Sequence, residues 1–345
     1  MRILPLGGLA ALALGLAACA DTTAPLPAPT EDLLVVNSTA NTLSVIPVSA
    51  TSSGTAIPLG GTTPTPVGVD ARNGVALVPL GADNSVAVVD LRTGVVKRIQ
   101  LPANSGATGV AIVSDSIAYV ANPNINSVTR VNYVSGDTAS LAVGTYPQGV
   151  IFTRGKVFVL NGNLDSTYQP AGPSWLTVID PVTNTVKDSV GLGGGENAQF
   201  ATIGSDGLLY VMNSGSFSGG EGQLSVVDPV AGKWIANFGG FGTAPGPVAA
   251  SGDHLFIASY SEGLMEFNTA DRTVLRGAGQ GIAIASNSTV ATDAEGRVYA
   301  VSSGPCAGGN PGTAHVYSAE LTPGGTISLG ECSVGALVTA VPPTP

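Results

Sequence analysis

Basic side chains are scarce in this sequence. Thirteen Lys and Arg stand against 23 Asp and Glu in 345 residues, which gives a net charge of −10. The basic residues are scattered along the chain, whereas non-specific binding to nucleic acid depends on clusters of Lys and Arg. The composition therefore argues against a nucleic-acid partner, and the same argument disfavours binding of single-stranded DNA.

Histidine is scarcer still, with His254 and His315 as its two occurrences. A Ser-His-Asp triad needs a histidine that reaches a nucleophile, and no GxSxG elbow accompanies either residue. His254 adjoins a tight turn at the start of an expected strand, and His315 is expected to lie on the opposite face. Both are therefore interpreted as surface or sheet-edge residues. The prediction is that the chain has no catalytic residue, no cofactor and no metal site.

Long hydrophobic runs are missing after the N-terminal segment, Met1 to Ala18. This segment has Arg2 near its start, continues as a Leu/Ala/Gly run and is too short to span a membrane, which is typical of an export signal. Leu16-Ala17-Ala18-Cys19 resembles the lipobox of bacterial lipoproteins. The resemblance implies cleavage before Cys19 and lipid attachment to its sulfur. A plain secretory signal with an incidental cysteine is the alternative.

The segment after the signal predicts an anchored protein of the cell envelope. Residues 19–30 contain DTTAPLPAPT, which is typical of an extended linker. Ala20 follows the cysteine, which by the sorting rule of lipoproteins favours the outer membrane, with the protein facing periplasm or exterior. The remaining domain, residues 31–341, is expected to contact the membrane through lipid alone, and residues 342–345 form a tail.

Cysteine is rare, and Cys306 and Cys332 are the two that follow Cys19. In an oxidising compartment an isolated pair is most simply a disulfide. A metal or redox role would favour CxxC spacing or a nearby histidine cluster, and neither is present. The pair is therefore predicted to form a disulfide.

Aromatic residues make up 5% of the chain, whereas Gly contributes 47 residues. Long amphipathic helical patterns are absent, and these features favour an all-β fold with many turns. A pattern of about 42 residues recurs about seven times, and such a period is typical of repeat architectures. Its first strand occurs as LLVVN (Leu33–Asn37), ALVPL (Ala76–Leu80), AYVAN (Ala118–Asn122), VFVLN (Val157–Asn161), LYVMN (Leu209–Asn213), LFIAS (Leu255–Ser259) and VYAVS (Val298–Ser302).

A second strand follows each of these after a polar turn: TLSVIP, SVAVVD, SVTRVN, LTVID, LSVVD, LMEFN or HVYSAEL. Tight Gly/Asn turns such as Arg72-Asn73-Gly74 precede the first strand of most repeats and predict hairpins. Each repeat is therefore interpreted as four short antiparallel strands, the unit of a β-propeller blade. The two strands quoted above are the second and third of the four.

The two ends of the repeat array predict how the ring closes. The first repeat begins at Leu33 with what should be its second strand, while Ala336–Val341 is a spare strand at the other end. We therefore predict a closed seven-bladed β-propeller in which the C-terminal strand completes the N-terminal blade. Closure removes the open sheet edge that would otherwise favour aggregation.

The chain resembles the seven-bladed YVTN-type repeat proteins of bacterial surfaces and the periplasm. The matching residues are YVAN at Tyr119–Asn122, NSVTRVN at Asn126–Asn132 and PQGV at Pro147–Val150. The resemblance covers residues 31–341 and weakens in repeats six and seven. It implies architecture rather than activity, because one fold carries many functions.

Acids that end the third strands have a structural interpretation. Asp90, Asp180 and Asp228 each precede a turn, and their carboxylates can accept hydrogen bonds from the backbone N–H groups of that turn. Segments such as Asp228 to Trp234 also approach a quinoprotein repeat. Trp234 is the single tryptophan so placed, which disfavours a quinone cofactor.

The irregular links between second and third strands are the candidate binding elements. They are long in repeats four (Gly162–Ser174), five (Ser214–Gly222) and seven (Ser303–Thr313), and in a propeller such links share a face with the entries of the inner strands. Aromatic, amide and carboxylate groups there suit a peptide, a glycan or a small polar ligand. The candidates are Tyr146, Gln148, Asp165, Tyr168, Gln169, Trp175, Glu196, Asn197, Gln199, Phe217 and Glu221.

Three functional hypotheses remain for this face. The first is a lipid-anchored binding or scaffold module whose partner is an envelope protein, a peptide or a glycan. The second is a lactonase-like hydrolase with a divalent metal on oxygen ligands, for which Glu196, Asn197 and Asp165 are the best group available. In the third, the loops merely cover the mouth of the channel.

Overall fold

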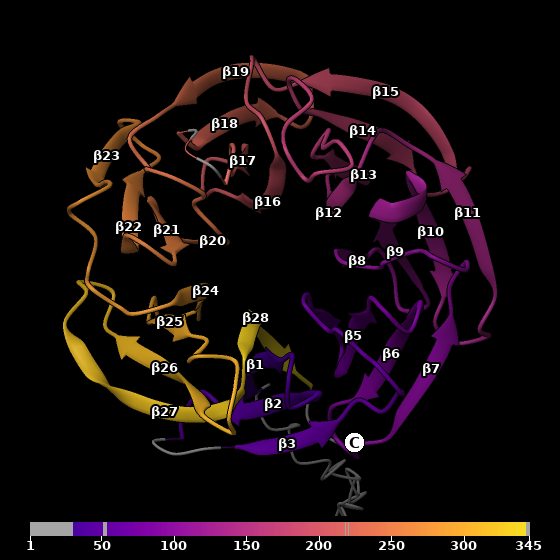
Figure 1. Cartoon of the computed structure of the whole chain (residues 1–345), viewed down its shortest axis with the longest axis horizontal. Coiled ribbons are helices and arrows are strands. Elements are labelled where there is room, and N and C mark those ends of the chain that lie inside the picture. The colour runs from indigo at the N-terminus through magenta and orange to yellow at the C-terminus, as the bar shows by residue number, and fades with distance from the viewer. Residues whose placement is uncertain (1–29, 51–53, 218, 220, 343–345) are drawn as a thin grey trace, which may run out of the picture.

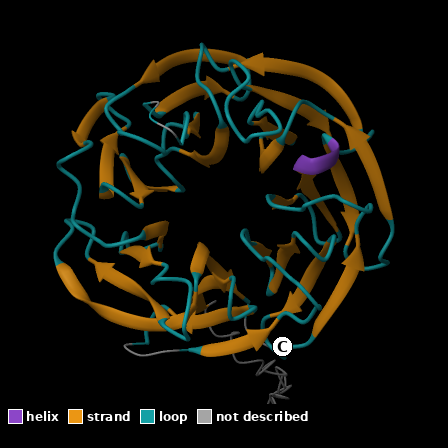
Figure 2. Ribbon diagram, in the orientation of Figure 1, coloured by secondary structure: helices purple, strands orange, loops and turns teal. Residues whose placement is uncertain are grey.

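The computed structural model describes residues 30–50, 54–217, 219 and 221–342, and within them the chain folds as seven four-stranded antiparallel sheets around a central axis (Figure 1). The predicted signal, Cys19 and most of the linker lie outside the described residues. Strands dominate, with one 3-10 turn, η1 (Pro123–Ile125), between two strands of the third blade (Figure 2). No helix in the described residues is long and apolar enough to cross a membrane.

Each blade is numbered by its place in the chain, and its strands are given from the channel outward. Blades 1 to 4 consist of β28 (Ser333–Val341), β1 (Thr30–Asn37), β2 (Thr42–Pro47) and β3 (Thr55–Pro58); β4 (Asp70–Arg72), β5 (Val75–Leu80), β6 (Ser85–Asp90) and β7 (Val96–Gln100); β8 (Val110–Ile112), β9 (Ile117–Asn122), β10 (Ser127–Asn132) and β11 (Thr138–Ala142); and β12 (Pro147–Thr153), β13 (Lys156–Asn161), β14 (Trp175–Asp180) and β15 (Thr185–Gly191). Blades 5 to 7 consist of β16 (Ala198–Ile203), β17 (Leu209–Asn213), β18 (Gln223–Asp228) and β19 (Lys233–Phe238); β20 (Val248–Ser251), β21 (His254–Ser259), β22 (Gly263–Asn268) and β23 (Thr273–Arg276); and β24 (Asn287–Thr292), β25 (Val298–Ser302), β26 (Pro311–Tyr317) and β27 (Pro323–Glu331).

The asparagine that ends the second strand of several blades explains part of the repeat pattern. In blade 3 the buried Asn122 donates from Nδ2 to the hydroxyls of Ser127 and Thr129, at 3.1 and 2.8 Å. In blade 5 Asn213 donates to Ser225 at 2.7 Å. A buried amide without partners would be costly. The Asn and the Ser/Thr of the repeat therefore form one polar unit within an apolar sheet.

Glycine at the start of an inner strand is required where neighbouring blades approach each other. A Cβ atom on Gly109 would lie 2.5 Å from the carbonyl oxygen of Gln148, and one on Gly149 would lie 2.6 Å from that of Gln199. These distances are shorter than real contacts, so the blades would have to separate. The same contact recurs at Gly335 against Val67. This close approach of the blades explains why the PQGV segment has a glycine, Gly149.

The hydrophobic core lies between blades rather than in one central cluster. Strand residues alternate between the two faces of each sheet, so a blade packs one row against each neighbour. Blade 4, for example, packs Phe158 and Leu176 against Leu209 and Val211 of blade 5. The middle strands are buried on both faces, which accounts for their nearly continuous apolar runs.

The seam of the ring lies in blade 1, as predicted. β28 pairs antiparallel with β1 from Thr30–Val341 to Asn37–Ser333, with an irregularity after Val36. The strand is longer than the predicted Ala336–Val341, because it begins at Ser333. Chain ends far apart in sequence thus share one sheet (Figure 1).

The predicted disulfide joins Cys306 to Cys332 beside this seam. Cys306 belongs to the link before β26, and Cys332 stands between β27 and β28. The carbonyl of Cys332 accepts the N–H of Ser38 in blade 1 at 2.7 Å. The bond therefore fastens blade 7 to the place where the ring closes.

The third strand of blade 7 departs from the prediction. HVYSAEL was expected to form it, whereas β26 spans Pro311–Tyr317 and Ser318 begins a turn closed by the N–H of Leu321. The shift arises because Val301 pairs with Ala314 rather than with a residue further along. The link before β26 is therefore 303–310, shorter than expected.

Candidate functional site

The disc has two unlike faces. The loop face carries the links between second and third strands and the links that enter the inner strands. The turn face carries the tight turns between first and second strands and between third and fourth strands.

On the turn face Asp180 and Asp228 accept hydrogen bonds from the N–H groups of Val182 and Val230, at 2.9 and 2.8 Å, as their sequence context predicts. The N–H of Val182 is the main cause that lowers the pKa of the Asp180 carboxyl.

The mouth of the channel on the loop face is a cavity of about 550 Å³ built from the starts of the inner strands. A volume of this size lies within the range of ligand pockets. Its lining contains no Asp, Glu, Lys, Arg or His. The polar side chains that line it are Thr108, Tyr146, Gln148, Gln199, Tyr260, Ser288 and Thr289.

The long link of blade 4 contacts the mouth through Tyr168, which packs against Tyr146, a residue of the lining. Tyr168, 57% exposed, packs edge-on against Tyr146 with ring centroids 5.8 Å apart. Burial, followed by the proximity of Tyr168, raises the pKa of the Tyr146 phenol. Both backbones have positive φ values, 51° and 61°, which non-glycine residues rarely adopt. The pair therefore forms an aromatic wall at the edge of the mouth.

Amide side chains join blades 4 and 5 at the mouth. Gln148 donates from Nε2 to Oδ1 of Asn197 at 2.7 Å, and Asn197 is fully buried and donates to the carbonyl of Gly215 at 3.0 Å. Ser214 donates to Gln199 at 3.2 Å. The long link of blade 5 is thus fixed to the inner-strand entries.

The links of blades 4 and 5 also contact each other. Ser216 donates its hydroxyl proton to Oε1 of Gln169 at 2.8 Å. Gln169 in turn gives its backbone N–H to Asp165 at 3.1 Å. The two insertions therefore form one continuous rim over the mouth.

Other candidates have local roles or lie away from the mouth. Asp165 is exposed and accepts the Thr167 hydroxyl at 2.7 Å, which is the first cause that lowers the pKa of its carboxyl. Trp175 covers Gly144, where a Cβ atom would lie 2.5 Å from the indole ring. Glu221 accepts the N–H of Gly240 at 2.6 Å. None of these three lines the mouth.

Two further candidates, Phe217 and Glu196, lie on the surface. Phe217 is 53% exposed in the link of blade 5. Glu196 is exposed beside the buried Asn197, and its carbonyl accepts the N–H of Gly215 at 3.0 Å. Neither side chain lines the mouth, although both are accessible to a larger partner.

The group considered for a metal gains no support from these contacts. Both ends of the Asn197 amide are hydrogen-bonded within the protein, and Asp165 is held by its own turn. Within the part of the chain that the structure describes, no three His, Cys, Asp or Glu side chains come together as metal ligands. The hydrolase therefore stays a prediction from the sequence alone.

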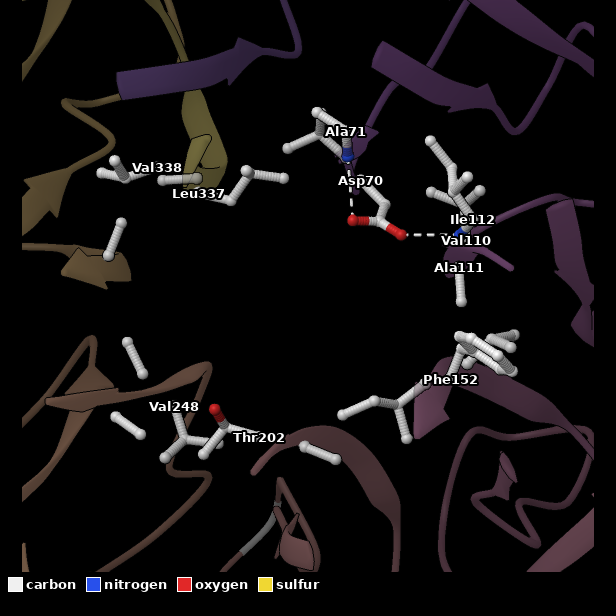
Figure 3. A pocket seen from close by; sticks show the side chains of 18 of the residues that line it. Asp70, Ala71, Val110, Ala111, Ile112, Phe152, Thr202, Val248, Leu337 and Val338 are labelled. Carbon is white, nitrogen blue, oxygen red and sulfur yellow. Dashed lines mark hydrogen bonds between the residues drawn. The ribbon is translucent and has the colours of Figure 1, made fainter. Parts of the chain in front are cut away.

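The half of the channel away from the mouth combines aliphatic side chains with the polar residues Arg72, Thr202 and Thr292. A cavity of about 580 Å³ is lined by residues such as Ile112, Phe152 and Leu337, and Asp70 lies in its wall (Figure 3). Asp70 accepts the N–H of Ile112 in blade 3 at 2.6 Å and that of Ala71 at 2.8 Å. Burial raises the pKa of Asp70 despite these hydrogen bonds.

Sequence reasoning missed Tyr260 and misplaced the link of blade 7. Tyr260 stands in the short link after β21, is 57% exposed and lines the mouth. The signal that could have revealed it was an aromatic residue in the short link between the second and third strands of blade 6. The link 303–310 contributes nothing to the mouth lining. It is held to the seam by the disulfide and by the N–H of Gly309, which donates to Glu331 at 3.1 Å.

Comparisons with known proteins show the fold of the chain. A functionally unknown protein from Desulfotomaculum acetoxidans is similar with a TM-score of 0.67 and 14% identity, over 91% of this chain and 99% of that one. Virginiamycin B lyase from Staphylococcus aureus matches with a TM-score of 0.62 and 14% identity, over 78% and 95%. Kuenenia stuttgartiensis hydrazine synthase matches with 0.58 and 15%, over 74% and 77%.

No protein-family model matches the sequence, and no curated protein matches it significantly. At these identities the structural likeness shows the fold alone. The chain is a seven-bladed β-propeller whose structural relatives have unlike functions.

Proposed function

We propose that this protein is a lipid-anchored β-propeller of the cell envelope, of the YVTN type, that binds an uncharged polar ligand at the mouth of its channel. The observation that carries the proposal is the lining of the mouth, which combines two tyrosines, two glutamines and hydroxyl groups with no ionisable acid, base or imidazole. Such a surface recognises a glycan or an uncharged peptide segment through ring contacts and amide hydrogen bonds.

The rim supports a preformed binding site. Gln148 is held by Asn197, and Ser214 links Gln199 to the carbonyl of Pro245 at 2.9 Å. Side chains that are held in place before binding lose little entropy when a ligand arrives. The two long links therefore preorganise the mouth.

The place of the predicted anchor supports the orientation. β1 begins at Thr30, which pairs with Val341 at the turn-face end of β28, whereas the mouth is at the opposite end. A lipid on Cys19 would reach the disc through residues 20–29, from the turn face. The mouth would then point away from the membrane.

Array binding tests the proposed ligand class. The full-length mature protein, solubilised in detergent, is applied to an array of neutral oligosaccharides and uncharged peptides. Tyr168→Ala with Tyr260→Ala should weaken binding of the best ligand at least about tenfold, which corresponds to about 1.4 kcal/mol. Trp234→Ala, which removes a partly exposed aromatic residue on β19, is the matched control. Equal binding by all three proteins would refute the proposed site.

A separate experiment tests the anchor. Cells expressing the protein are fed an alkyne-labelled fatty acid, and the label on the protein is compared with that on Cys19→Ser. Label that persists in the variant would contradict lipidation at Cys19. This result would leave the proposal for the mouth untouched.

A further inference from the structure

Blade 6 carries a row of polar side chains that crosses all four of its strands. Ser251 on β20 is the register partner of His254 on β21. Glu266 on β22 is the partner of both Phe256 and Arg276. Register partners, and residues two apart on one strand, project from the same face of a sheet. The row therefore lies on one face of the blade, with Phe256 as its apolar member.

This row departs from the repeat. Glu266 is the register partner of Phe256 on the second strand, and at the equivalent register position of the third strand five of the other blades have valine. Blade 3 has Arg130 there, and the valines are Val45, Val88, Val178, Val226 and Val316. Valine at this position contributes to the apolar packing between blades, and a carboxylate at the same position does not.

Glu266 is buried and held on both oxygens. Its Oε1 lies 2.7 Å from Nδ1 of His254 and its Oε2 lies 3.2 Å from Nε of Arg276, while its side chain is 10% exposed. A carboxylate only accepts, so Nδ1 of His254 carries a proton, and Nε2 is the remaining ring nitrogen. Among the described residues, neither this Nε2 nor the terminal nitrogens of Arg276 have a hydrogen-bond partner.

The row forms one wall of a cavity of about 560 Å³ between blades 6 and 7. The opposite wall comes from blade 7 and includes Glu295 and Glu320 as well as the apolar Ala294, Ala319 and Leu321. Glu295 pairs with Arg297 at 3.3 Å, and Glu320 accepts the hydroxyl of Ser318 at 2.9 Å. The guanidinium group of Arg276 thus lines one wall and the carboxylates of Glu295 and Glu320 line the other, and each wall also carries apolar side chains.

We propose that this interblade cavity binds a small zwitterion, either an α-amino acid or a dipeptide with an apolar side chain. Its carboxylate pairs with the terminal nitrogens of Arg276, because guanidinium groups bind carboxylates in a fork. Its ammonium group faces Glu295 and Glu320, and its side chain lies against Phe256 and Leu321. Glu266 is a positioning residue, since it holds Arg276 and His254 without facing the ligand through a free oxygen.

Calorimetric titration of the full-length mature protein tests this site with leucine and the dipeptide Leu-Leu as probes. N-acetyl-leucine lacks the ammonium group and leucinamide lacks the carboxylate, so each removes one half of the recognition. At least one zwitterion should bind, and the two blocked compounds should bind at least about tenfold more weakly. Failure of both zwitterions at about 10 mM would overturn the proposal, and so would equal binding of N-acetyl-leucine.

Protein variants locate the site. Arg276→Gln should weaken binding of the zwitterion at least about tenfold, and Glu320→Gln about threefold. Arg272→Gln is the control, because this exposed arginine lies on the neighbouring turn and does not line the cavity. Melting temperatures show whether each variant is folded. A folded Arg276→Gln variant that binds as tightly as Arg272→Gln would overturn the proposal, whatever happens at the mouth.

Discussion

The mouth of the channel and the interblade cavity differ in how they depart from the repeat. The mouth is built from the starts of the inner strands, and inserted residues in the links of blades 4 and 5, which stand outside the sheets, contact these strands at its edge. The interblade cavity is built by substitutions within the strands of blade 6, with no insertion at all. The first region is uncharged, whereas the second separates opposite charges on two walls.

This difference teaches that a repeat fold offers two independent routes to a site. An insertion leaves the strand pattern intact, so the blade keeps its apolar contacts. A substitution such as Glu266 places a charge between blades, and its burial must be compensated by partners. A change in one region is therefore expected to leave the other unaffected, provided that the ring stays closed.

Opening the ring should lower the stability of the protein more than any other change and should disrupt both regions. Truncation after Gly335 removes most of β28, which holds β1 and contributes Ala336 to the mouth. We expect the melting temperature to fall by more than about 10 °C. Truncation after Pro342 keeps β28 and should melt like the full chain in calorimetry. An unchanged melting temperature after the Gly335 truncation would contradict closure by this strand.

Removing the disulfide should destabilise the fold without changing either region. Cys306→Ser with Cys332→Ser opens a link across a separation of 26 residues, for which the chain-entropy relation gives about 3.5 kcal/mol. Denaturant unfolding measures this loss, and reduced wild-type protein should lose the same amount. Ligand binding at 25 °C should persist, because the link 303–310 does not line the mouth. Loss of mouth binding in a folded variant would contradict this separation.

Restoring the repeat in blade 6 should separate the two regions most clearly. Glu266→Val introduces the residue that five other blades carry. The variant leaves His254 and Arg276 without their partner, but their side chains are 40% and 45% exposed, so water can solvate them. We expect the free energy of unfolding to change by less than about 1 kcal/mol. Zwitterion binding should be lost while mouth binding is kept. A loss of more than about 3 kcal/mol would show that Glu266 serves the fold.

The smallest effect is expected from Asp70, in the half of the channel away from the mouth. Its pKa is raised above the ordinary 3.8 by burial, so its contribution to stability is present below that value and is lost as pH rises through the folded-state pKa. The melting temperature of wild type minus that of Asp70→Asn should therefore decrease from about pH 4 to pH 7. A difference that stays constant or increases over this range would contradict the direction of the shift.

Much of the fold could be predicted because each blade repeats the same local chemistry. Asn213 and Ser225 occupy the same strand positions in their repeat as Asn122 and Thr129 do in theirs, and both pairs form hydrogen bonds. The disulfide followed from composition and compartment. The third strand of blade 7 was misplaced because that repeat is irregular, so its register depends on pairing with β25 rather than on a local signal.

The candidate site could be predicted only in part. Insertions are visible in a sequence, so Tyr168 was named as a candidate, and Tyr146 and Gln148 were named because they lie at the start of an inner strand. Whether an inserted side chain turns toward the mouth depends on its surroundings, and Trp175 lies over Gly144 instead. Tyr260 was missed because a short link gives no signal of length.

The sequence by itself determined the number of blades, the position of the seam and the pairing of the cysteines, because these follow from repetition and from residue types. Tertiary structure decided which side chains meet. Ser251, His254, Glu266 and Arg276 are dispersed over 26 positions of one repeat, and the antiparallel register brings them into a single row. The facing acids come from the next blade, and the packing of blade 7 against blade 6 places them opposite the row.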